Sequence, residues 1–562
     1  MSVLFLLAPA IIVLIAGYLF YSRYLARLLN LGSLQKTPAH ERRDDVDYVP
    51  AKMPVLLGHH FASIAGAAPI IGPVLAAQYG WLPVYLWIVF GGVFIGAVHD
   101  FTALTASVRH GGMSIGTIIE TYLGRKGKLL FLLFAWAALI LVTAVFTRAV
   151  ASTFAARGET ATSSLFFIAL ALLFGVAVHR FKVPLWAASI VGGVMLLCCL
   201  YCGYFLPFPR IWSVRGGTDP MVVFWTVIIS VYVFIASVTP VHILLQPRDY
   251  LNSFLLYAML GVSIAAIFVS APVTRGPAVT TFSVEGLGPL FPMLFISVAC
   301  GAVSGFHSMV ASGTTAKQLY KETDARPVAY GGMLIESLLA VIALISVVYV
   351  SRNVYLARLF GGPGGADPVG AFSEGVSYMM VSLGFGRDFG RVFIALAVSA
   401  FALTSLDTAV RLARFTFQEI FSFSDAHSTR EKTGPGGDVA RFLSNRYAAT
   451  AITVSAAVGL LLTGEGLNLI WQLFGTANQL LASLALMAVT IWLSRLRKKT
   501  WFTFVPMVMM YVVTVSALGW KLAGSLRDGG FLTASIAAAL ILLAFALAVE
   551  YIRSCIRNSE KT

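Results

Sequence analysis

GHHFASIAGAAPIIGP, from Gly58 to Pro73, is an apolar segment that contains two histidines, three glycines and two prolines. A proline removes a backbone hydrogen-bond donor, and the hydrocarbon core of a membrane supplies no water to replace it. Irregular backbone at membrane depth is therefore tolerated where it lines a cavity or is buried in protein. The segment predicts a membrane helix that is broken beside a cavity, and broken helices of this kind hold the substrates of secondary transporters.

The composition indicates an all-α polytopic membrane protein. Of the 562 residues, 58% are hydrophobic and 12% are charged, and the mean hydropathy is +0.84. A span needs about 20 apolar residues, and the chain supplies about 15 such runs (14 to 16), which leaves no room for a separate soluble enzyme domain. Another apolar run, 371–385, is too short and predicts a re-entrant or interfacial helix. The predicted spans are residues 3–22, 55–78, 82–107, 129–149, 163–178, 184–206, 221–243, 251–270, 290–311, 329–350, 392–409, 447–464, 467–493, 502–520 and 531–551.

The net charge of +15 reflects membrane topology and does not indicate binding to nucleic acid. With 15 spans and the N-terminus outside, 29 of the 40 Lys and Arg residues fall in loops on the cytoplasmic side, as the positive-inside rule requires. This topology places the C-terminus in the cytoplasm. The first span has no cleavage-site pattern, so we expect it to be retained in the membrane.

The chain contains one suggestive internal repeat. The spacing of Gly58, His60 and Gly66 recurs in a second segment, SGFHSMVASGTTAKQL (304–319), as Gly305, His307 and Gly313. The two segments are seven spans apart and therefore cross the membrane in opposite directions, as inverted repeats must. Three matched positions can also arise by chance in a chain with 50 glycines. The pattern favours a core with two broken helices in inverted repeats.

Asp100, Glu336 and Asp407 fall inside predicted spans, where charged groups are costly and commonly functional. Asp100 follows His99 in the third span, and Glu336 in the tenth is a candidate for proton coupling. Asp407 ends the eleventh span four residues before Arg411, which predicts an intrahelical ion pair. Gating or coupling is the alternative role of Asp407.

Two further polar segments interrupt the apolar pattern. LFGTANQLLA (473–482) places Asn478 and Gln479 inside a span, where amides bond neighbouring helices or contact substrate. HILLQPRDYLNSF (242–254) lies between two predicted spans, where the proline ends one helix and Asp249 caps the next. A structural or gating hinge is expected there.

Six segments together resemble the carbon starvation protein A family of bacterial inner-membrane transporters: GHHFASIAGAAPIIGP, VHDF, LLQPRDYL, SGFHSMVASGTTAKQL, LTSLDTAVRLAR and LFGTANQLLA. The resemblance runs from about Pro54 to Ala482. It implies the inverted-repeat, LeuT-like core of the amino acid, polyamine and organocation transporters. It also implies transport of pyruvate or peptides in response to carbon starvation, coupled to protons. The implied division is 1–53 for the N-terminal helix and cytoplasmic loop, 54–482 for the transporter core and 483–562 for the C-terminal transmembrane helices.

From the residues themselves, the predicted substrate site lies between the two broken helices. Helix ends near Gly66 to Pro73 and near Ser312 to Thr315 would offer backbone N–H groups to a substrate carboxylate. His60 and His307 would lie beside it, with an interhelical hydrogen bond as the alternative role of each. The predicted substrate-binding residues are His60, Ser63, Gly66, His307, Ser312, Gly313, Thr314, Asn478 and Gln479, and the coupling or gating residues are Asp100, Glu336 and Asp407.

Another class of protein is compatible with the histidines. A membrane enzyme or sensor could coordinate a metal, although no HExxH or similar local spacing is present. We expect a transporter that is not an enzyme and carries no metal or cofactor. The choice between proton and sodium coupling, the substrate and the oligomeric state stay open. The potential ligands of the metal alternative are His59, His60, His99, Asp100, His242 and His307.

Overall fold

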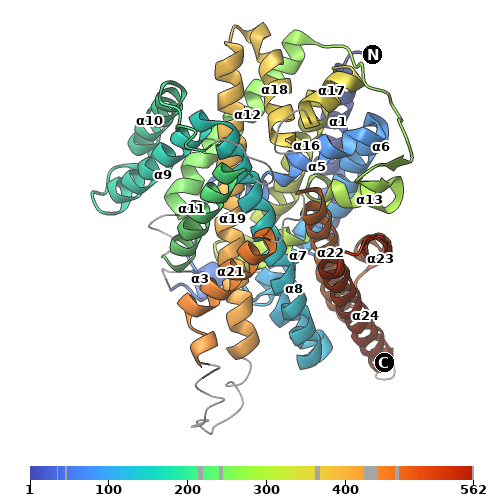
Figure 1. Cartoon of the computed structure of the whole chain (residues 1–562). Coiled ribbons are helices and arrows are strands. Elements are labelled where there is room, and N and C mark those ends of the chain that lie inside the picture. The colour runs from blue at the N-terminus through green and yellow to red at the C-terminus, as the bar shows by residue number, and fades with distance from the viewer. Residues whose placement is uncertain are drawn as a thin grey trace.

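The protein is a bundle of helices in the computed structural model (Figure 1). The structure describes residues 1–559 apart from 34–35, 45–46, 213–218, 240–244, 361–366, 423–438, 440 and 463–466. The first α-helices are α1 (Leu4–Ala16), α2 (Ser22–Leu28), α3 (Pro38–Glu41), α4 (Met53–Ile64), α5 (Ala68–Ala76), α6 (Trp81–Leu86), α7 (Ala97–Arg109), α8 (Ile115–Ala156), α9 (Gly158–His179), α10 (Leu185–Phe205), α11 (Pro220–Val238) and α12 (Leu245–Ser270). The later ones are α13 (Leu290–Ser297), α14 (Ala299–Ala302), α15 (Gly305–Gly313), α16 (Gly332–Val348), α17 (Arg352–Phe360), α18 (Pro368–Met380), α19 (Arg387–Ser422), α21 (Arg446–Leu462), α22 (Leu467–Arg495), α23 (Trp501–Arg527) and α24 (Phe531–Ser559).

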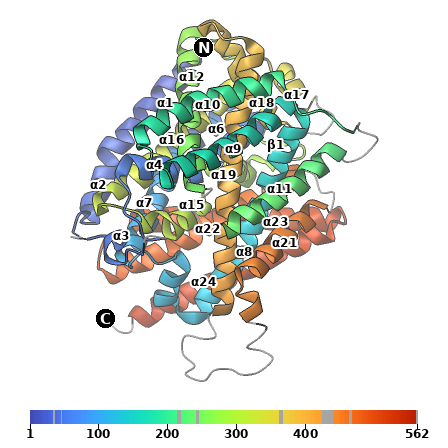
Figure 2. The ribbon, with the colours of Figure 1, turned by 90° about the vertical axis from the view of Figure 1, so that its left-hand side faces the viewer.

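Shorter elements join these helices. A two-stranded antiparallel hairpin, β1 (Ser283–Val284) with β2 (Gly288–Pro289), lies between α12 and α13. The start of α1 and the end of α24 lie toward opposite ends of the bundle in both views (Figures 1 and 2). Helices α9 and α10 pair on the outside of the bundle, at the left of Figure 1 and in front in Figure 2. Turns of π-helix or 3-10 helix are η1 (Gly17–Tyr21), η2 (Ala77–Tyr79), η3 (Trp87–Gly96), η4 (Thr315–Lys317), η5 (Glu322–Asp324), η6 (Arg326–Gly331) and η7 (Val381–Leu383).

Twelve helical stretches in the described part of the chain are long and apolar enough to cross a membrane. Each corresponds to one of the predicted spans. The three remaining predictions fall on helices that are broken or short. Residues 55–78 form a pair bent by 47°, residues 290–311 are split among α13, α14 and α15, and α21 has 17 residues. The run at 371–385 forms the short, mostly buried α18 and one turn after it.

The first predicted break is confirmed between α4 and α5. The backbone leaves the helix at Ala65, where ψ is 63°, and resumes at Ala68 with Pro69 in the first turn. The carbonyl of Ser63 accepts a hydrogen bond from Ser405 Oγ at 3.1 Å, which partly replaces the lost helical bonding. A Cβ at position 66 would lie 2.8 Å from the Ser405 hydroxyl, so the absence of a side chain at Gly66 allows this contact.

A second broken helix is also present, but its break differs from the predicted position. Val303 and Ser304 are extended, and α15 begins at Gly305. Ser312 and Gly313 end α15, and Thr314 and Thr315 follow it. This segment therefore lies at the C-terminal end of the helix, which offers carbonyl groups and not the predicted N–H groups. Gly313 instead allows close packing, because a Cβ there would lie 2.6 Å from Leu412 Cδ2.

The positions of the breaks also test the internal repeat that was predicted from the spacing of glycine and histidine in the two segments. The first break follows His60, whereas the second precedes His307. The matched histidines therefore do not occupy equivalent places relative to the breaks. The two broken helices nevertheless pack together, because Gly72 on α5 approaches the carbonyl of Ser297 so closely that a Cβ would lie 2.4 Å from its oxygen.

Candidate functional site

Four ionisable side chains form a cluster in the core, which we call the buried ion cluster. His99 and Asp100 come from α7, His307 from α15 and Glu336 from α16, and none has any exposed surface. Asp100 Oδ2 lies 2.8 Å from His307 Nδ1, and Asp100 Oδ1 lies 2.7 Å from His99 Nδ1. Glu336 Oε2 lies 3.3 Å from His307 Nε2. The fold thus places one imidazole between two carboxyl groups.

The charges of this cluster allow it to carry one exchangeable proton. With both carboxyl groups ionised and His307 protonated, Asp100, His307 and Glu336 together have a net charge of −1. A net charge without solvent contact is costly, and one added proton removes it. Neither oxygen of Glu336 has a hydrogen-bond partner among the described residues, so this carboxyl group can accept the proton.

His60 lies beside the second broken helix without joining the ion pairs. Its Nδ1 is 2.8 Å from the hydroxyl of Thr315, just after α15, and its side chain is fully buried. In the part of the chain that the structure describes, its Nε2 has no hydrogen-bond partner. A Cβ at Gly332, where α16 begins, would lie 3.5 Å from the His60 ring. His60 therefore links α4 to the second broken helix and keeps one nitrogen available.

Asp407 belongs to a second network, and the predicted ion pair with Arg411 is wrong. Arg248 on α12 donates to Asp407 Oδ2, and Tyr232 on α11 donates to the same oxygen at 3.0 Å. Arg411 instead donates to the carbonyl groups of Ala236 and Thr239 at 2.8 Å and 2.7 Å. The spacing of Asp407 and Arg411 permits an i,i+4 contact, but each side chain bonds to another helix.

The segment around Arg248 is also more buried than a loop hinge would be. Arg248 and Asp249 are both 1% exposed and lie near the start of α12. The prediction that Asp249 caps the helix is wrong, because this residue lies inside α12. Its Oδ2 lies 3.3 Å from His59 Nδ1 on α4, and its Oδ1 lies 3.5 Å from Arg248. We call His59, Tyr232, Arg248, Asp249 and Asp407 the second ion network.

The other predicted substrate residues have contacts within the protein. Ser63 and Thr314 each donate to the carbonyl four residues earlier, at 2.9 Å in both cases. Ser312 donates to its own helix at 2.8 Å and accepts from the N–H of Ile115 at 3.3 Å. These hydroxyls therefore support helices in this structure.

The two amides on α22 hold the second broken helix. Asn478 Oδ1 accepts from the backbone N–H of Phe306 at 2.8 Å, and its Nδ2 donates to Ser304 Oγ at 3.0 Å. Asn478 therefore caps the new helix at the break. Gln479 donates to the carbonyl of Phe295 on α13. Of the two roles left open for these amides, the observed contacts are those of interhelical bonding.

Gly305 permits the same close contact between α15 and α22. A Cβ at this position would lie 2.3 Å from the carbonyl oxygen of Asn478 and 2.3 Å from the backbone nitrogen of Ala482. We expect Gly305→Ala to destabilise the protein by about 1–3 kcal/mol, because backbone atoms cannot yield as a flexible side chain can. Thermal unfolding of the purified protein measures this loss. Gly261→Ala on α12 is the matched control, since nothing lies within 4 Å of its Cβ position; equal stability of both variants would contradict the prediction.

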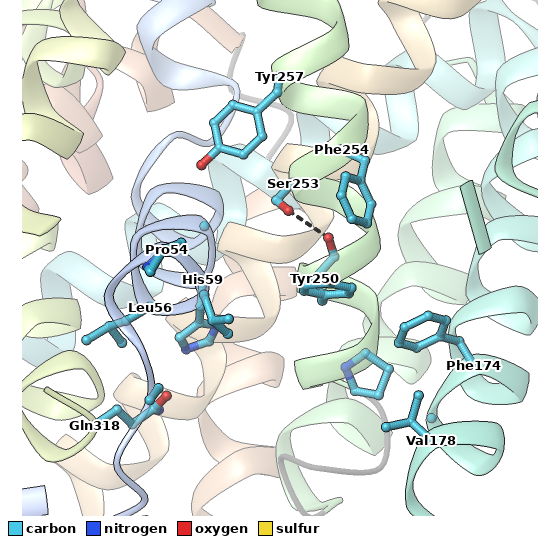
Figure 3. Close-up of a pocket in the computed structure, with 15 residues that line it drawn as sticks. Pro54, Leu56, His59, Phe174, Val178, Tyr250, Ser253, Phe254, Tyr257 and Gln318 are labelled. Atoms are coloured by element: carbon cyan, nitrogen blue, oxygen red, sulfur yellow. Dashed lines mark hydrogen bonds between the residues drawn. The ribbon is translucent and has the colours of Figure 1, made fainter. Parts of the chain in front are cut away.

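Two cavities adjoin these elements. The first, about 400 Å³, lies between α4, α9 and α12 and is bordered by His59 (Figure 3). The second, about 490 Å³, is bordered by Ser312 and Gly313 at the end of α15 and by Lys317 and Glu419. Both cavities include residues from the segments that follow α3 and α15, so they lie toward the same end of the bundle.

The potential metal ligands are divided between separate groups of contacts, and three of them, His99, Asp100 and His307, lie in the buried ion cluster. Within the described residues, no group of three or more His, Cys, Asp or Glu side chains is placed to hold a metal ion. His59 contacts Asp249, whereas His60 contacts Thr315. His242, another of the potential ligands, lies outside the described residues.

Sequence reasoning missed Tyr232 and the pairing of Arg248. Tyr232 lies in an apolar span with no polar neighbour pattern, and no signal in the sequence marks it. The sequence does contain an indication for Arg248. An arginine beside a membrane span must either reach the surface or pair with a buried group. The helix that supplies this partner is known only from the fold.

Comparison with known proteins gives consistent matches over most of the chain. The family model described as Carbon starvation protein CstA matches residues 2–360 and 363–517. The peptide transporter CstA of Campylobacter jejuni is 33% identical over 92% of this chain and 79% of that protein. The peptide transporter CstA of Bacillus subtilis is 32% identical over 92% and 90%. The pyruvate/proton symporter BtsT of Escherichia coli is 31% identical over 93% and 82%.

A solved structure shares the fold. The crystal structure of a manganese transporter mutant from Eremococcus coleocola superposes with a TM-score of 0.51 over 91% of this chain and 99% of that one. The sequence identity is 9%, so the similarity concerns the arrangement of the helices alone.

Proposed function

This chain belongs to the carbon starvation protein CstA family, and on that basis we propose that it is a secondary active transporter that imports a carboxylate-bearing nutrient, pyruvate or a peptide, together with protons. Transport proceeds by alternating access, and the protein is not an enzyme. Relatives named as peptide transporters and one named as a pyruvate/proton symporter support the two substrate classes and the coupling ion. The family name supports a role in carbon starvation.

The observation that carries this proposal is the buried ion cluster. A carboxyl group that has no solvent contact, has no hydrogen-bond partner within the described residues and lies 3.3 Å from an imidazole is suited to binding and releasing a proton. Glu336, His307 and Asp100 lie on three helices, one of which is the second broken helix. Protonation can therefore change how these helices pack, which is what coupling requires.

The proposed architecture is an inverted-repeat core with two broken helices within residues 54–482. The contact between the broken helices at Gly72 and Ser297 supports it, and so does the fold shared with a manganese transporter. Fifteen spans, counting the broken and short helices, place the two termini on opposite sides of the bacterial inner membrane. The opposite positions of the chain ends in Figures 1 and 2 support this parity, and the positive-inside rule assigns the N-terminus to the outside.

The substrate carboxylate binds at the break between α4 and α5, beside His60. The buried Nε2 of His60 has no hydrogen-bond partner among the residues that the structure describes and can donate a hydrogen bond to a carboxylate. The first turn of α5 adds N–H groups at a helix N-terminus, where an anion is favoured. The bilayer lipid, the small-molecule substrate and the proton are the partners that this proposal requires.

Uptake by proteoliposomes tests the function directly. Labelled pyruvate and labelled dipeptides are offered with a proton gradient and a sodium gradient imposed separately. We expect a proton gradient to drive accumulation of at least one substrate. Accumulation driven by sodium alone would contradict the coupling ion, and no uptake by vesicles that contain folded protein would contradict the transporter assignment.

The histidine assignment has its own test. We expect His60→Ala and His307→Ala each to reduce uptake about tenfold or more, because one removes a substrate contact and the other the imidazole between two carboxyl groups. Membrane abundance, measured by immunoblot in the same preparations, is expected to stay close to wild type for His60→Ala. Unchanged uptake in both variants would contradict the assignment.

A further inference from the structure

The cavity in Figure 3 has an aromatic wall on one side. Tyr250 and Phe254 come from α12, with ring centroids 5.1 Å apart, and Phe174 comes from α9, with its centroid 5.7 Å from Tyr250. The Tyr250 hydroxyl lies 2.8 Å from the hydroxyl of Ser189 on α10, which fixes the ring. Tyr257, two turns further along α12, also borders the cavity. The wall therefore presents fixed aromatic surface.

The other side of the cavity has a single group suited to an anion. Among the fifteen described residues that border the cavity, His59 is the one His, Lys, Arg, Asp or Glu side chain. The side chain of His59 is 15% exposed, and its Nδ1 lies 3.3 Å from Asp249, which is 1% exposed. An imidazole N–H of His59 can donate a hydrogen bond to a carboxylate in the cavity. Figure 3 shows His59 on the α4 side and Tyr250 on the α12 side.

The size of the cavity excludes pyruvate as a ligand that fills it. A volume of about 400 Å³ is within the range of sites for drug-sized ligands, and a three-carbon acid leaves most of the aromatic wall uncovered. An amino-acid residue with a ring and a carboxylate matches both sides. The ligand that satisfies the wall and His59 together is amphipathic and carries one carboxylate near an aromatic group.

We propose that this cavity binds the C-terminal residue of a peptide, with its aromatic side chain against Tyr250, Phe254 and Phe174 and its carboxylate beside His59. The proposal rests on the function proposed above and names the kind of peptide that the transporter prefers. Neither side of the cavity belongs to the buried ion cluster or to the break between α4 and α5. It is therefore a second binding site, which the C-terminal residue occupies at a different stage of transport from the binding of its carboxylate beside His60, and it is distinct from the site where coupling occurs.

Binding of labelled dipeptides to the purified full-length protein in detergent tests the site without requiring transport. We expect Ala-Phe to bind about tenfold or more tightly than Ala-Ala, which lacks the ring, and than Ala-Phe amide, which lacks the carboxylate. Phe-Ala, with the ring on the N-terminal residue, is expected to bind like Ala-Ala. Equal affinities for all four peptides would overturn the proposal.

Variants locate the binding in this cavity. Tyr250→Ala is expected to weaken Ala-Phe binding about tenfold, while Tyr250→Phe, which keeps the ring and loses the hydroxyl, keeps the affinity close to wild type. Gly175→Leu on α9 fills the cavity and is a second variant in case the truncation unfolds the protein. Wild-type affinity for Ala-Phe in folded Gly175→Leu would place the binding elsewhere and overturn the proposal.

Transport and binding measured together distinguish failure of the site from failure of the proposed function. If proteoliposomes take up dipeptides but show no preference for a C-terminal ring, the recognition site is wrong and the transporter assignment stands. If no substrate is taken up but Ala-Phe binds as expected, the transport function is wrong and the site stands. Phospholipid that co-purifies with wild type, is lost in Gly175→Leu and is not displaced by Ala-Phe would identify the occupant as an acyl chain, and would overturn the proposal.

Discussion

Replacing Glu336 with glutamine is expected to abolish proton-driven accumulation of substrate while leaving exchange of substrate across the membrane intact. In the wild type, Glu336 and Asp100 flank His307, and one proton neutralises the three charges. In the Glu336→Gln variant, the remaining pair of Asp100 and protonated His307 is already neutral, so a further proton would not remove a net charge and is not expected to bind. The variant can still change conformation with substrate bound, but the proton gradient no longer drives it.

The measurement compares two modes of the same proteoliposomes. Accumulation under a proton gradient is expected to fall about tenfold or more, to the level reached without a gradient. Counterflow of labelled substrate against unlabelled substrate, with no gradient, is expected to stay within about twofold of wild type. Ser346→Ala is the matched control, because Ser346 is also fully buried on α16 and donates within its own helix, to the carbonyl of Ala343. Normal accumulation by Glu336→Gln would remove Glu336 from the coupling mechanism.

The presence of a helix break can be predicted from sequence, because glycine and proline affect the backbone conformation at and next to their own positions. The segment from Gly58 to Pro73 indicates its break through Gly66 and Pro69, and the structure confirms it within this segment. The spacing pattern places the second break too far along the chain. Gly313 matches Gly66 in spacing and so predicts a break, whereas it serves close packing against Leu412. A glycine in a sequence can indicate either a break in the backbone or close packing by a neighbouring residue, and the sequence alone does not distinguish the two.

The partners of the charged groups cannot be predicted from sequence. Asp100 and His307 are 207 residues apart, and the helical pattern gives the face of each helix but not the helix that meets it. The i,i+4 rule offers a plausible partner for Asp407 and fails, because Arg411 reaches the carbonyl groups at the end of α11. A buried ion finds the partner that the packing supplies, and packing is a property of the whole chain.

Removing one member of the Arg248 and Asp407 pair is expected to destabilise the folded protein strongly, by more than Gly305→Ala. Arg248 is 1% exposed and Asp407 is fully buried, so Asp407→Leu leaves the guanidinium without its main counter-charge. The expected cost is about 3–5 kcal/mol. Unfolding of the purified protein, followed by the fluorescence of its 10 tryptophans, measures the change.

The matched control and a compensated variant show whether charge or shape causes the loss. Asp388→Leu removes a carboxylate from the exposed start of the same helix, where Asp388 is 68% exposed and its partner Arg391 is 42% exposed, and should cost less than about 1 kcal/mol. The combination of Arg248→Met, Asp407→Leu and Tyr232→Phe removes both charges and the hydroxyl that bonds them. Because replacing a whole buried ion pair by apolar groups is often neutral, we expect this combination to recover most of the stability lost in Asp407→Leu. If the second ion network gates the cavity at His59, the combined variant is expected to be stable but to transport little substrate. Recovery of transport together with stability would show that the network has only a structural role.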